Sequence, residues 1–161
     1  MAASEAKALA STHPAMLVAT VCGVGLLPKA PGTWGSLVSL PFAWLVARAW
    51  GSSGLLLGAA VLFALGWWAA ARITRGRGGD PQFIVIDEAA GQFLALATVP
   101  LDPLFFAAAF VLFRLFDVAK PFPVGWADRH IGGGFGVMFD DVLAALYAVA
   151  VLLIARLLLG R

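Results

Sequence analysis

The sequence predicts an all-α integral membrane protein, a helical bundle of about four to five transmembrane helices joined by Gly/Pro-rich cytoplasmic loops. Hydrophobic residues make up 61% of the 161 positions and charged residues only 12%, about half the share usual in soluble domains. Long apolar runs alternate with glycine- and proline-containing segments. No polar block is large enough to fold separately, so we predict a single membrane-embedded domain over residues 1–161, with 1–14 as a flexible N-terminus.

The N-terminal apolar segment, MLVATVCGVGLL at residues 16–27, is too short to span a bilayer comfortably. It lacks a clear small-x-small cleavage site, so we expect a retained interfacial or re-entrant segment. Cys22 is the single cysteine, so no intrachain disulfide is possible and nothing requires an oxidising compartment.

Two turn sequences, GSSG (51–54) and PLDP (100–103), predict two helical hairpins. The segments GLLPKAPGTWGS (25–36) and KPFPVGWADRHIGGGFGVMF (120–139) contain several glycines and prolines, and we expect both to be structured loops. The candidate crossings are residues 37–50, 54–70, 87–99, 104–120 and 142–159.

The cationic residues divide between the two ends predicted for the bundle. By the positive-inside rule, the end that holds more of them faces the cytoplasm. The formal net charge of +2 suits an anionic lipid surface, and because no basic run with stacking aromatics occurs we expect no nucleic-acid binding. The cytoplasmic group is Lys29, Arg72, Arg75, Arg77, Lys120 and Arg129, and the opposite group is Arg48, Arg156 and Arg161.

Most of the carboxylates fall on the predicted cytoplasmic side, where three helix ends can converge. One helix opens with Asp87 and Glu88, a second closes with Asp117, and the last opens with Asp140 and Asp141. Helix capping would explain a single acid at a helix start. It does not explain two adjacent pairs, or an acid at a helix C-terminus, where the dipole disfavours it. The seven acids on this side are Asp80, Asp87, Glu88, Asp117, Asp128, Asp140 and Asp141.

Clustered carboxylates are ligands that suit Mg²⁺, which proteins usually share with phosphate. Zinc is disfavoured because Cys22 is solitary and the two histidines are far apart in the chain. Arg114, Asp117 and Lys120 recur at i, i+3 and i+6, which places two cations beside a carboxylate. Such cations either hold a phosphoryl group or form an intramembrane ion pair with a snorkelling lysine, and the residues alone favour neither.

Two glycine-rich stretches offer backbone N–H groups that could face an anion. These are GGGFG at residues 132–136 and GTWGS at residues 32–36, the latter with help from the hydroxyls of Thr33 and Ser36. No GKS or GKT follows either stretch, so chemistry on nucleoside triphosphates is disfavoured.

Taken together, four blocks of this chain resemble the phosphatidylglycerophosphatase A family. The resemblance covers most of residues 25–145 and implies a bacterial inner-membrane, multi-pass lipid phosphatase whose active site faces the cytoplasm. It also implies Mg²⁺-dependent removal of the terminal phosphate from phosphatidylglycerophosphate, with Asp87, Glu88, Asp117, Asp140 and Asp141 as the acidic active site. The blocks are GLLPKAPGTWGS, DPQFIVIDEAAGQ, FRLFDVAKPFPVGWAD and GGGFGVMFDDVLAA.

On this interpretation some of the five acids hold Mg²⁺, and another orients or deprotonates water or attacks phosphorus itself. Lys120, Arg114 and Arg129 would bind phosphate oxygens. An alternative function is a small proton or cation transporter, but a conduction path predicts acids spread through the membrane depth, whereas these gather at one face. A phosphatidyltransferase is disfavoured because its DGxxAR and GxxxDxxxD spacing is absent.

Overall fold

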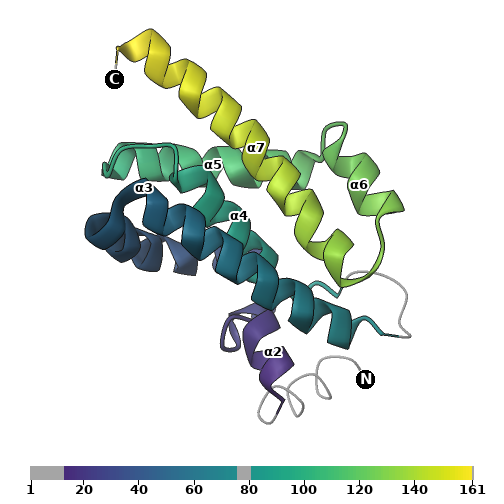
Figure 1. Cartoon of the computed structure of the whole chain (residues 1–161). Coiled ribbons are helices and arrows are strands. Elements are labelled where there is room, and N and C mark those ends of the chain that lie inside the picture. Colours follow the sequence, from purple (N-terminus) through teal and green to yellow (C-terminus); the bar gives the residue numbers. More distant parts are fainter. Residues whose placement is uncertain (1–12, 76–80, 161) are drawn as a thin grey trace.

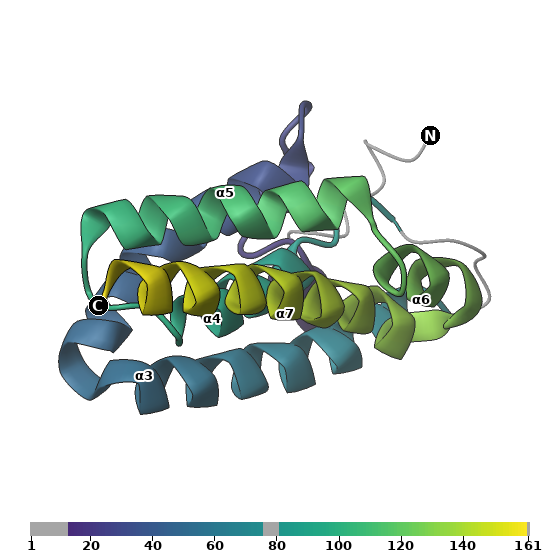
Figure 2. The ribbon, with the colours of Figure 1, turned by 90° about the horizontal axis from the view of Figure 1, so that it is seen from above.

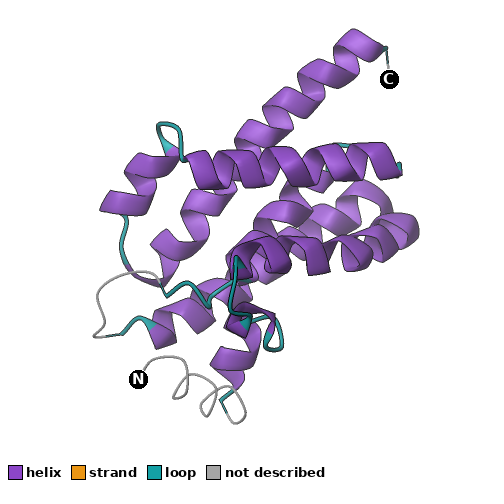
Figure 3. Cartoon of the chain, turned by 180° about the vertical axis from the view of Figure 1, so that it is seen from behind, coloured by secondary structure: helices purple, strands orange, loops and turns teal. Residues whose placement is uncertain are grey.

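The computed structural model describes residues 13–75 and 81–160, and this part of the chain is helical and contains no strand (Figure 3). The predicted all-α class is confirmed there. Most of the predicted N-terminal tail, together with Arg77, Asp80 and Arg161, lies outside the described residues. The elements are α2 (Pro14–Ala19), the 3₁₀ turn η1 (Val24–Leu26), α3 (Pro31–Ile73), α4 (Ile86–Leu96), α5 (Pro103–Ala119), α6 (Val124–His130) and α7 (Gly133–Leu159).

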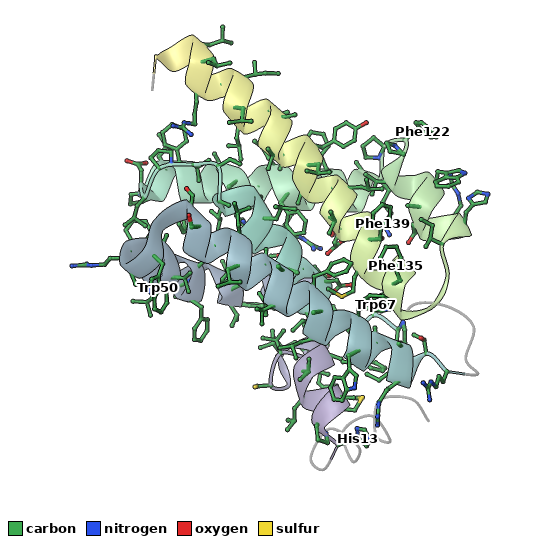
Figure 4. The ribbon with its side chains drawn as sticks, viewed as in Figure 1. His13, Trp50, Trp67, Phe122, Phe135 and Phe139 are labelled. Atoms are coloured by element: carbon green, nitrogen blue, oxygen red, sulfur yellow. The ribbon has the colours of Figure 1, made fainter. Side chains whose placement is uncertain are left out.

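Helix α3 is folded into two arms at Gly51, whose backbone is non-helical with φ 62° and ψ −154°. Glycine tolerates this left-handed φ because it has no Cβ. Core packing brings Ala43 of the first arm together with Leu55 and Ala59 of the second. The predicted hairpin with its turn at residues 51–54 is therefore confirmed. Trp50, which is 70% exposed, marks the turn in Figure 4.

The short helix α4 lies inside the bundle. Figure 2 shows α7 between α5 and the second arm of α3, with α4 beneath it. Nine of the eleven residues of α4 are buried. A Cβ added to Gly91 would come within 2.6 Å of the Phe113 ring and 3.2 Å of the Asp141 carbonyl oxygen, so this glycine permits α5 and α7 to approach α4 closely.

Within residues 13–75 and 81–160, two helices are long and apolar enough to cross a membrane, judged by length and composition: Pro31–Ile73 and Gly133–Leu158. Most residues in the most apolar window of each are not buried in the bundle, unlike those of a soluble core helix. By contrast, α4 with eleven residues extends only about 16 Å. The apolar run 87–99 was predicted to be a crossing, but its helix ends at Leu96 and is too short to span the bilayer core.

The first apolar segment does not form one long helix. Helix α2 has six residues, about 9 Å, and is followed by turns through Cys22 to η1. Its Ala15 and Ala19 pack in a cluster with Ala69 and Met138, and the Val85 N–H donates to the Ala19 carbonyl at 2.8 Å. The segment is thus attached to the side of the bundle.

The predicted charges that fall in described residues divide between the two ends of the bundle. One end holds the start of α3, the end of its second arm, the start of α4, the end of α5 and the helix α6 (Figure 1). The opposite end holds the Gly51 turn and the α4–α5 turn. There Arg156 donates through Nη1 to the Thr98 carbonyl at 2.5 Å.

Both segments predicted to be loops are partly helical, so the expectation of loops is wrong for residues 31–36, 124–130 and 133–139. Helix α3 already begins at Pro31, since proline suits the first helical position. Helix α6 and the start of α7 occupy most of 120–139. Asp140 and Asp141 therefore lie about two turns inside α7 and do not open it, which removes helix capping as their explanation.

Candidate active site

A cavity of about 460 Å³ lies where the start of α3, the start of α4, the end of α5 and the N-terminal part of α7 meet. We call it the acidic cavity because all five predicted acids line it. The acids thus converge at one end of the bundle as the sequence predicted, although Asp140 and Asp141 come from the interior of α7 and not from its start. The lining residues are Ala30, Pro31, Gly32, Thr33, Gln82, Ile84, Asp87, Glu88, Arg114, Asp117, Val118, Lys120, Asp140 and Asp141.

Three of the five acids form a compact group. One carboxylate oxygen from each of Asp87, Glu88 and Asp141 lies within 4.8 Å of the others. Asp87 and Glu88 are in the first turn of α4, where Asp87 Oδ1 accepts from the Glu88 N–H at 3.0 Å. Asp141 reaches the same point from α7. We call these three residues the acidic trio.

The donor set of the acidic trio fits a hard divalent cation. Asp87 and Asp141 are 6% and 4% exposed, and the Glu88 side chain 13%. Glu88 Oε2 and Asp141 Oδ2 are buried and accept no hydrogen bond from the protein. Buried carboxylate oxygens without a partner cost several kcal/mol unless a cation or proton compensates them. An all-oxygen set of this kind is suited to Mg²⁺ and unsuited to zinc.

Arg114 connects α5 to α4 at the floor of the cavity. Its Nη1 lies 2.6 Å from Asp117 Oδ2, one turn along α5, and 3.5 Å from Glu88 Oε1. This pair explains how Asp117 is tolerated in the last turn of α5, where the helix dipole disfavours an anion. The arginine is therefore placed to compensate the acids and to present N–H groups to an anion in the cavity.

Lys120 forms the second cationic point of the cavity. It follows α5 in a left-handed conformation and donates to Asp140 Oδ2 at 2.8 Å and to Asp128 Oδ1 at 2.5 Å. Burial by itself would lower the pKa of this amine, but the hydrogen bonds and charges of Asp128 and Asp140 outweigh it, so the Lys120 pKa is raised. Lys120 is thus held charged beside the acidic trio.

The start of α3 forms one wall of the cavity. A Cβ at Gly32 would overlap the Glu88 carboxylate, and Arg114 Nη2 would be 3.1 Å from it, so a larger residue here would displace the end of the Glu88 side chain. Thr33 lies in the first turn of α3. The N-cap residue is Ala30, whose side chain accepts no hydrogen bond from the N–H groups of this turn. A helix N-terminus of this kind favours an anion through its N–H groups and dipole.

The structure brings together most, but not all, of the predicted phosphate-binding residues. Lys120, Arg114 and Thr33 line the acidic cavity, whereas Ser36 and Arg129 do not. Ser36 is fully buried one turn further along α3, and Arg129 is exposed on α6. The α3 residues that line the cavity, Pro31, Gly32 and Thr33, belong to the first turn of this helix and not to a loop.

Two of the glycines of residues 132–136, Gly134 and Gly136, serve packing. A Cβ at Gly134 would overlap the backbone of Ala71, and one at Gly136 would overlap the Ile131 carbonyl, while none of these residues lines the cavity. Phe135 stacks on Phe139 and meets Trp67 edge-on, which Figure 4 shows between α7 and α3. The expected anion-binding loop at GGGFG is therefore wrong.

Three features of the cavity were missed in the sequence. Gln82 and Val118 line it, and Asp128 holds Lys120 from α6. Charge could have suggested the Asp128 contact. Asp128 comes eight residues after Lys120, and two prolines between them turn the chain back. Neither Gln82 nor Val118 carries a comparable signal in one sequence.

The chain matches the family model described as Phosphatidylglycerophosphatase A over residues 17–156. The phosphatidylglycerophosphatase A of Haemophilus influenzae is 42% identical over 147 residues, covering 90% of each chain. That of Escherichia coli is 35% identical over 147 residues, covering 89% of this chain and 84% of its own. A Bacteroides thetaiotaomicron relative, provisionally named a phosphatidylinositol-3-phosphatase, is 37% identical over 159 residues, covering 90% of this chain and 95% of its own. No solved structure matches.

The apolar bundle with acids and cations gathered in one cavity, together with these matches, defines the class of protein as a lipid phosphatase. The chain belongs to the phosphatidylglycerophosphatase A family.

Proposed function

We propose that this protein hydrolyses the terminal phosphomonoester of phosphatidylglycerophosphate to phosphatidylglycerol and inorganic phosphate, with Mg²⁺ as cofactor. The observation that carries the proposal is that five carboxylates and the two cations Arg114 and Lys120 line one cavity. Family membership supports the same substrate, since two of the relatives bear its name.

In this proposal the acidic trio holds Mg²⁺, which would draw electron density from a phosphate oxygen and so favour attack at phosphorus. Lys120 and Arg114 bind the remaining non-bridging oxygens, and the first turn of α3 donates N–H groups to them. The charge that develops on the phosphoryl group then meets donors already in place, which is the main source of catalysis in phosphoryl transfer.

Asp117 and Asp140 are the two carboxylates of the cavity outside the acidic trio, and each is paired with a cation. One of them orients or deprotonates the attacking water, or itself attacks phosphorus. In the hydrolytic route the water oxygen forms the new P–O bond, the ester P–O bond breaks, and the released glycerol oxygen takes a proton. The phosphate then leaves with the water's oxygen.

We further propose a multi-pass arrangement in the bacterial inner membrane with the acidic cavity at the cytoplasmic face. The two arms of α3 and helix α7 are each about 30 Å or longer, and α5 is about 26 Å, so four crossings suit the bilayer core. Helix α4 would stay buried among them. The orientation is supported by Lys29, Arg72 and Lys120 at the cavity end, in accordance with the positive-inside rule.

The proposal is tested with the purified protein in detergent and three lipids: phosphatidylglycerophosphate, phosphatidic acid and phosphatidylinositol 3-phosphate. We expect phosphate release from the first at least ten times faster than from the others. Preference for phosphatidylinositol 3-phosphate would replace the proposed substrate with the one named for the Bacteroides relative. No release from any lipid by folded protein would contradict the proposed activity.

A further inference from the structure

Helix α5 carries an exposed apolar stripe that leads to the acidic cavity. Leu104, Val111, Leu115 and Val118 recur at helical spacing, and each is more than half exposed. Val118 is 73% exposed and also lines the cavity. One side chain therefore belongs both to the polar site and to the outer apolar face.

A second apolar stripe lies on the first arm of α3, the helix whose start lines the cavity. Trp34, Leu37 and Leu45 follow one face of the first arm of α3 and are 45%, 40% and 63% exposed. Trp34 directly follows Thr33, which lines the cavity. Because α3 starts at the cavity and α5 ends there, both stripes extend from it toward the same end of the bundle. The two helices are in contact, with the Trp44 and Phe106 rings 4.9 Å apart.

The length of the α5 stripe is comparable with a lipid tail in one leaflet. From Leu104 to Val118 the helix rises about 21 Å at 1.5 Å per residue. Half of the hydrocarbon core of a bilayer is about 15 Å. An acyl chain that starts at the cavity could therefore remain on the stripe through its whole leaflet.

We propose that the acidic cavity opens sideways between Val118 and Trp34, and that the acyl chains of the phospholipid substrate lie along these two stripes while its phosphate enters the cavity. This inference rests on the proposed function and adds the route by which the substrate enters. The occupant is indicated by complementarity, because cations and N–H groups at one end and apolar side chains along the rest match an anionic head and its tails. Other exposed apolar faces, such as that of Leu57 and Val61, do not reach the cavity lining.

Photo-crosslinking tests the location without requiring turnover. A benzophenone side chain is introduced at Leu115, at Leu37 or, as the control, at Leu57, in the full chain reconstituted in phosphatidylcholine nanodiscs. Trace radiolabelled phosphatidylglycerophosphate is added in EDTA. We expect at least fivefold more label at the two stripe positions than at Leu57, and loss of that excess when unlabelled phosphatidylglycerophosphate competes. Equal labelling at all three positions overturns the inference.

A turnover experiment separates the entrance from the chemistry. Val118→Trp narrows the entrance while keeping it apolar, and Leu57→Trp is the matched control on a remote face. With a substrate bearing two hexadecanoyl chains, kcat/KM should fall at least tenfold for Val118→Trp and less than twofold for Leu57→Trp. With a substrate bearing hexanoyl chains, kcat/KM of Val118→Trp should fall less than threefold. Equal loss on both substrates, or none on either, contradicts the inference.

The two experiments also distinguish this inference from the proposed activity. Stripe-specific labelling of the benzophenone variants, together with no phosphate release by the wild-type protein, would leave the lipid route standing and remove the proposed reaction. Normal turnover with uniform labelling would remove the proposed lipid route and leave the proposed reaction standing.

Discussion

The ammonium group of Lys120, at the end of α5, lies 2.8 Å from Oδ2 of Asp140, twenty residues later in α7. This contact separates Asp140 from the acidic trio and fixes a positive charge at the edge of the acidic cavity. Together with the Arg114–Asp117 pair at 2.6 Å, it divides five acids that look alike in the sequence into the acidic trio and two acids that each lie directly against a cation.

Replacing Lys120 with Met should weaken phosphate binding more than it slows bond cleavage. The variant loses one donor to the phosphate oxygens and leaves Asp140 without its cation, so we expect KM to rise about 10- to 100-fold, equivalent to about 1.4–2.8 kcal/mol. The KM of the variant is measured from steady-state phosphate release. Asp128→Asn, which removes only the exposed partner of Lys120, should change KM less than threefold, and an equal effect of both variants would argue against a direct role.

The substitution Asp141→Asn should abolish both turnover and stabilisation by Mg²⁺. Since binding to the folded state raises stability, Mg²⁺ at a hundred times its Kd should stabilise wild type by about 2.7 kcal/mol, or roughly 5–10 °C in Tm. The variant should show less than a quarter of that shift while remaining folded in detergent. Thermal unfolding with and without Mg²⁺ measures this, and an unchanged shift in the variant would remove Asp141 from the metal site.

Substituting Gly32 with Ala should displace Glu88, because the added Cβ overlaps its carboxylate. We expect destabilisation by about 1–3 kcal/mol and at least a tenfold loss of kcat. Gly132→Ala is a suitable control, since the added methyl would meet nothing within 4 Å. That variant should stay within about 0.5 kcal/mol of wild type. Similar behaviour of the two variants would show that α3 does not pack against Glu88 in this way.

Arg129 should contribute little to catalysis, although the sequence suggested a role in phosphate binding. It is exposed on α6 and does not line the acidic cavity. We therefore expect Arg129→Ala to keep more than half of the wild-type kcat/KM, in contrast to Arg114→Ala, which should lose at least a hundredfold. Comparable losses in the two variants would mean that α6 closes over the bound substrate.

The raised pKa of Lys120 predicts how its contribution to stability depends on pH. A lysine whose pKa is higher in the folded state stabilises fully below its unfolded pKa and loses that contribution as pH rises toward the folded value. The Tm difference between wild type and Lys120→Met should thus not shrink between pH 7 and 9.5, and it should shrink only above that range. A difference that disappears near pH 8 would show that the amine is not held charged by Asp128 and Asp140.

Much of the fold follows from hydrophobic pattern and turn chemistry. The helical class, the Gly51 turn and the turn before Pro103 were predictable because apolar runs end at glycine, serine and proline. The helices within 25–36 and 120–139 were not. Glycine lowers helix propensity locally, but Gly35 and Gly134 are retained in helices because neighbouring backbone packs where a side chain would stand.

The sequence was sufficient to predict which acids form the site, but not how they are paired with the cations. Charge and the predicted ends of the apolar runs were enough to place Asp87, Glu88 and Asp141 at the same end of the bundle, although Asp141 lies about two turns inside α7 and not at its start. Which acid pairs with Lys120 and which with Arg114 depends on helix rotation and on the course of α6, and a single sequence specifies neither. Ser36 was misplaced for the same reason, because it falls one turn inside a helix expected to be a loop.

The most direct measurement is phosphate release from phosphatidylglycerophosphate by purified wild type and Asp87→Asn, each in Mg²⁺ and in EDTA. We expect rapid release by wild type in Mg²⁺, at least a hundredfold less in EDTA, and none above background from the variant in either condition. Release by wild type that is equal in Mg²⁺ and EDTA, or survives in Asp87→Asn, would contradict the assignment of the acidic trio as a metal-dependent phosphatase site.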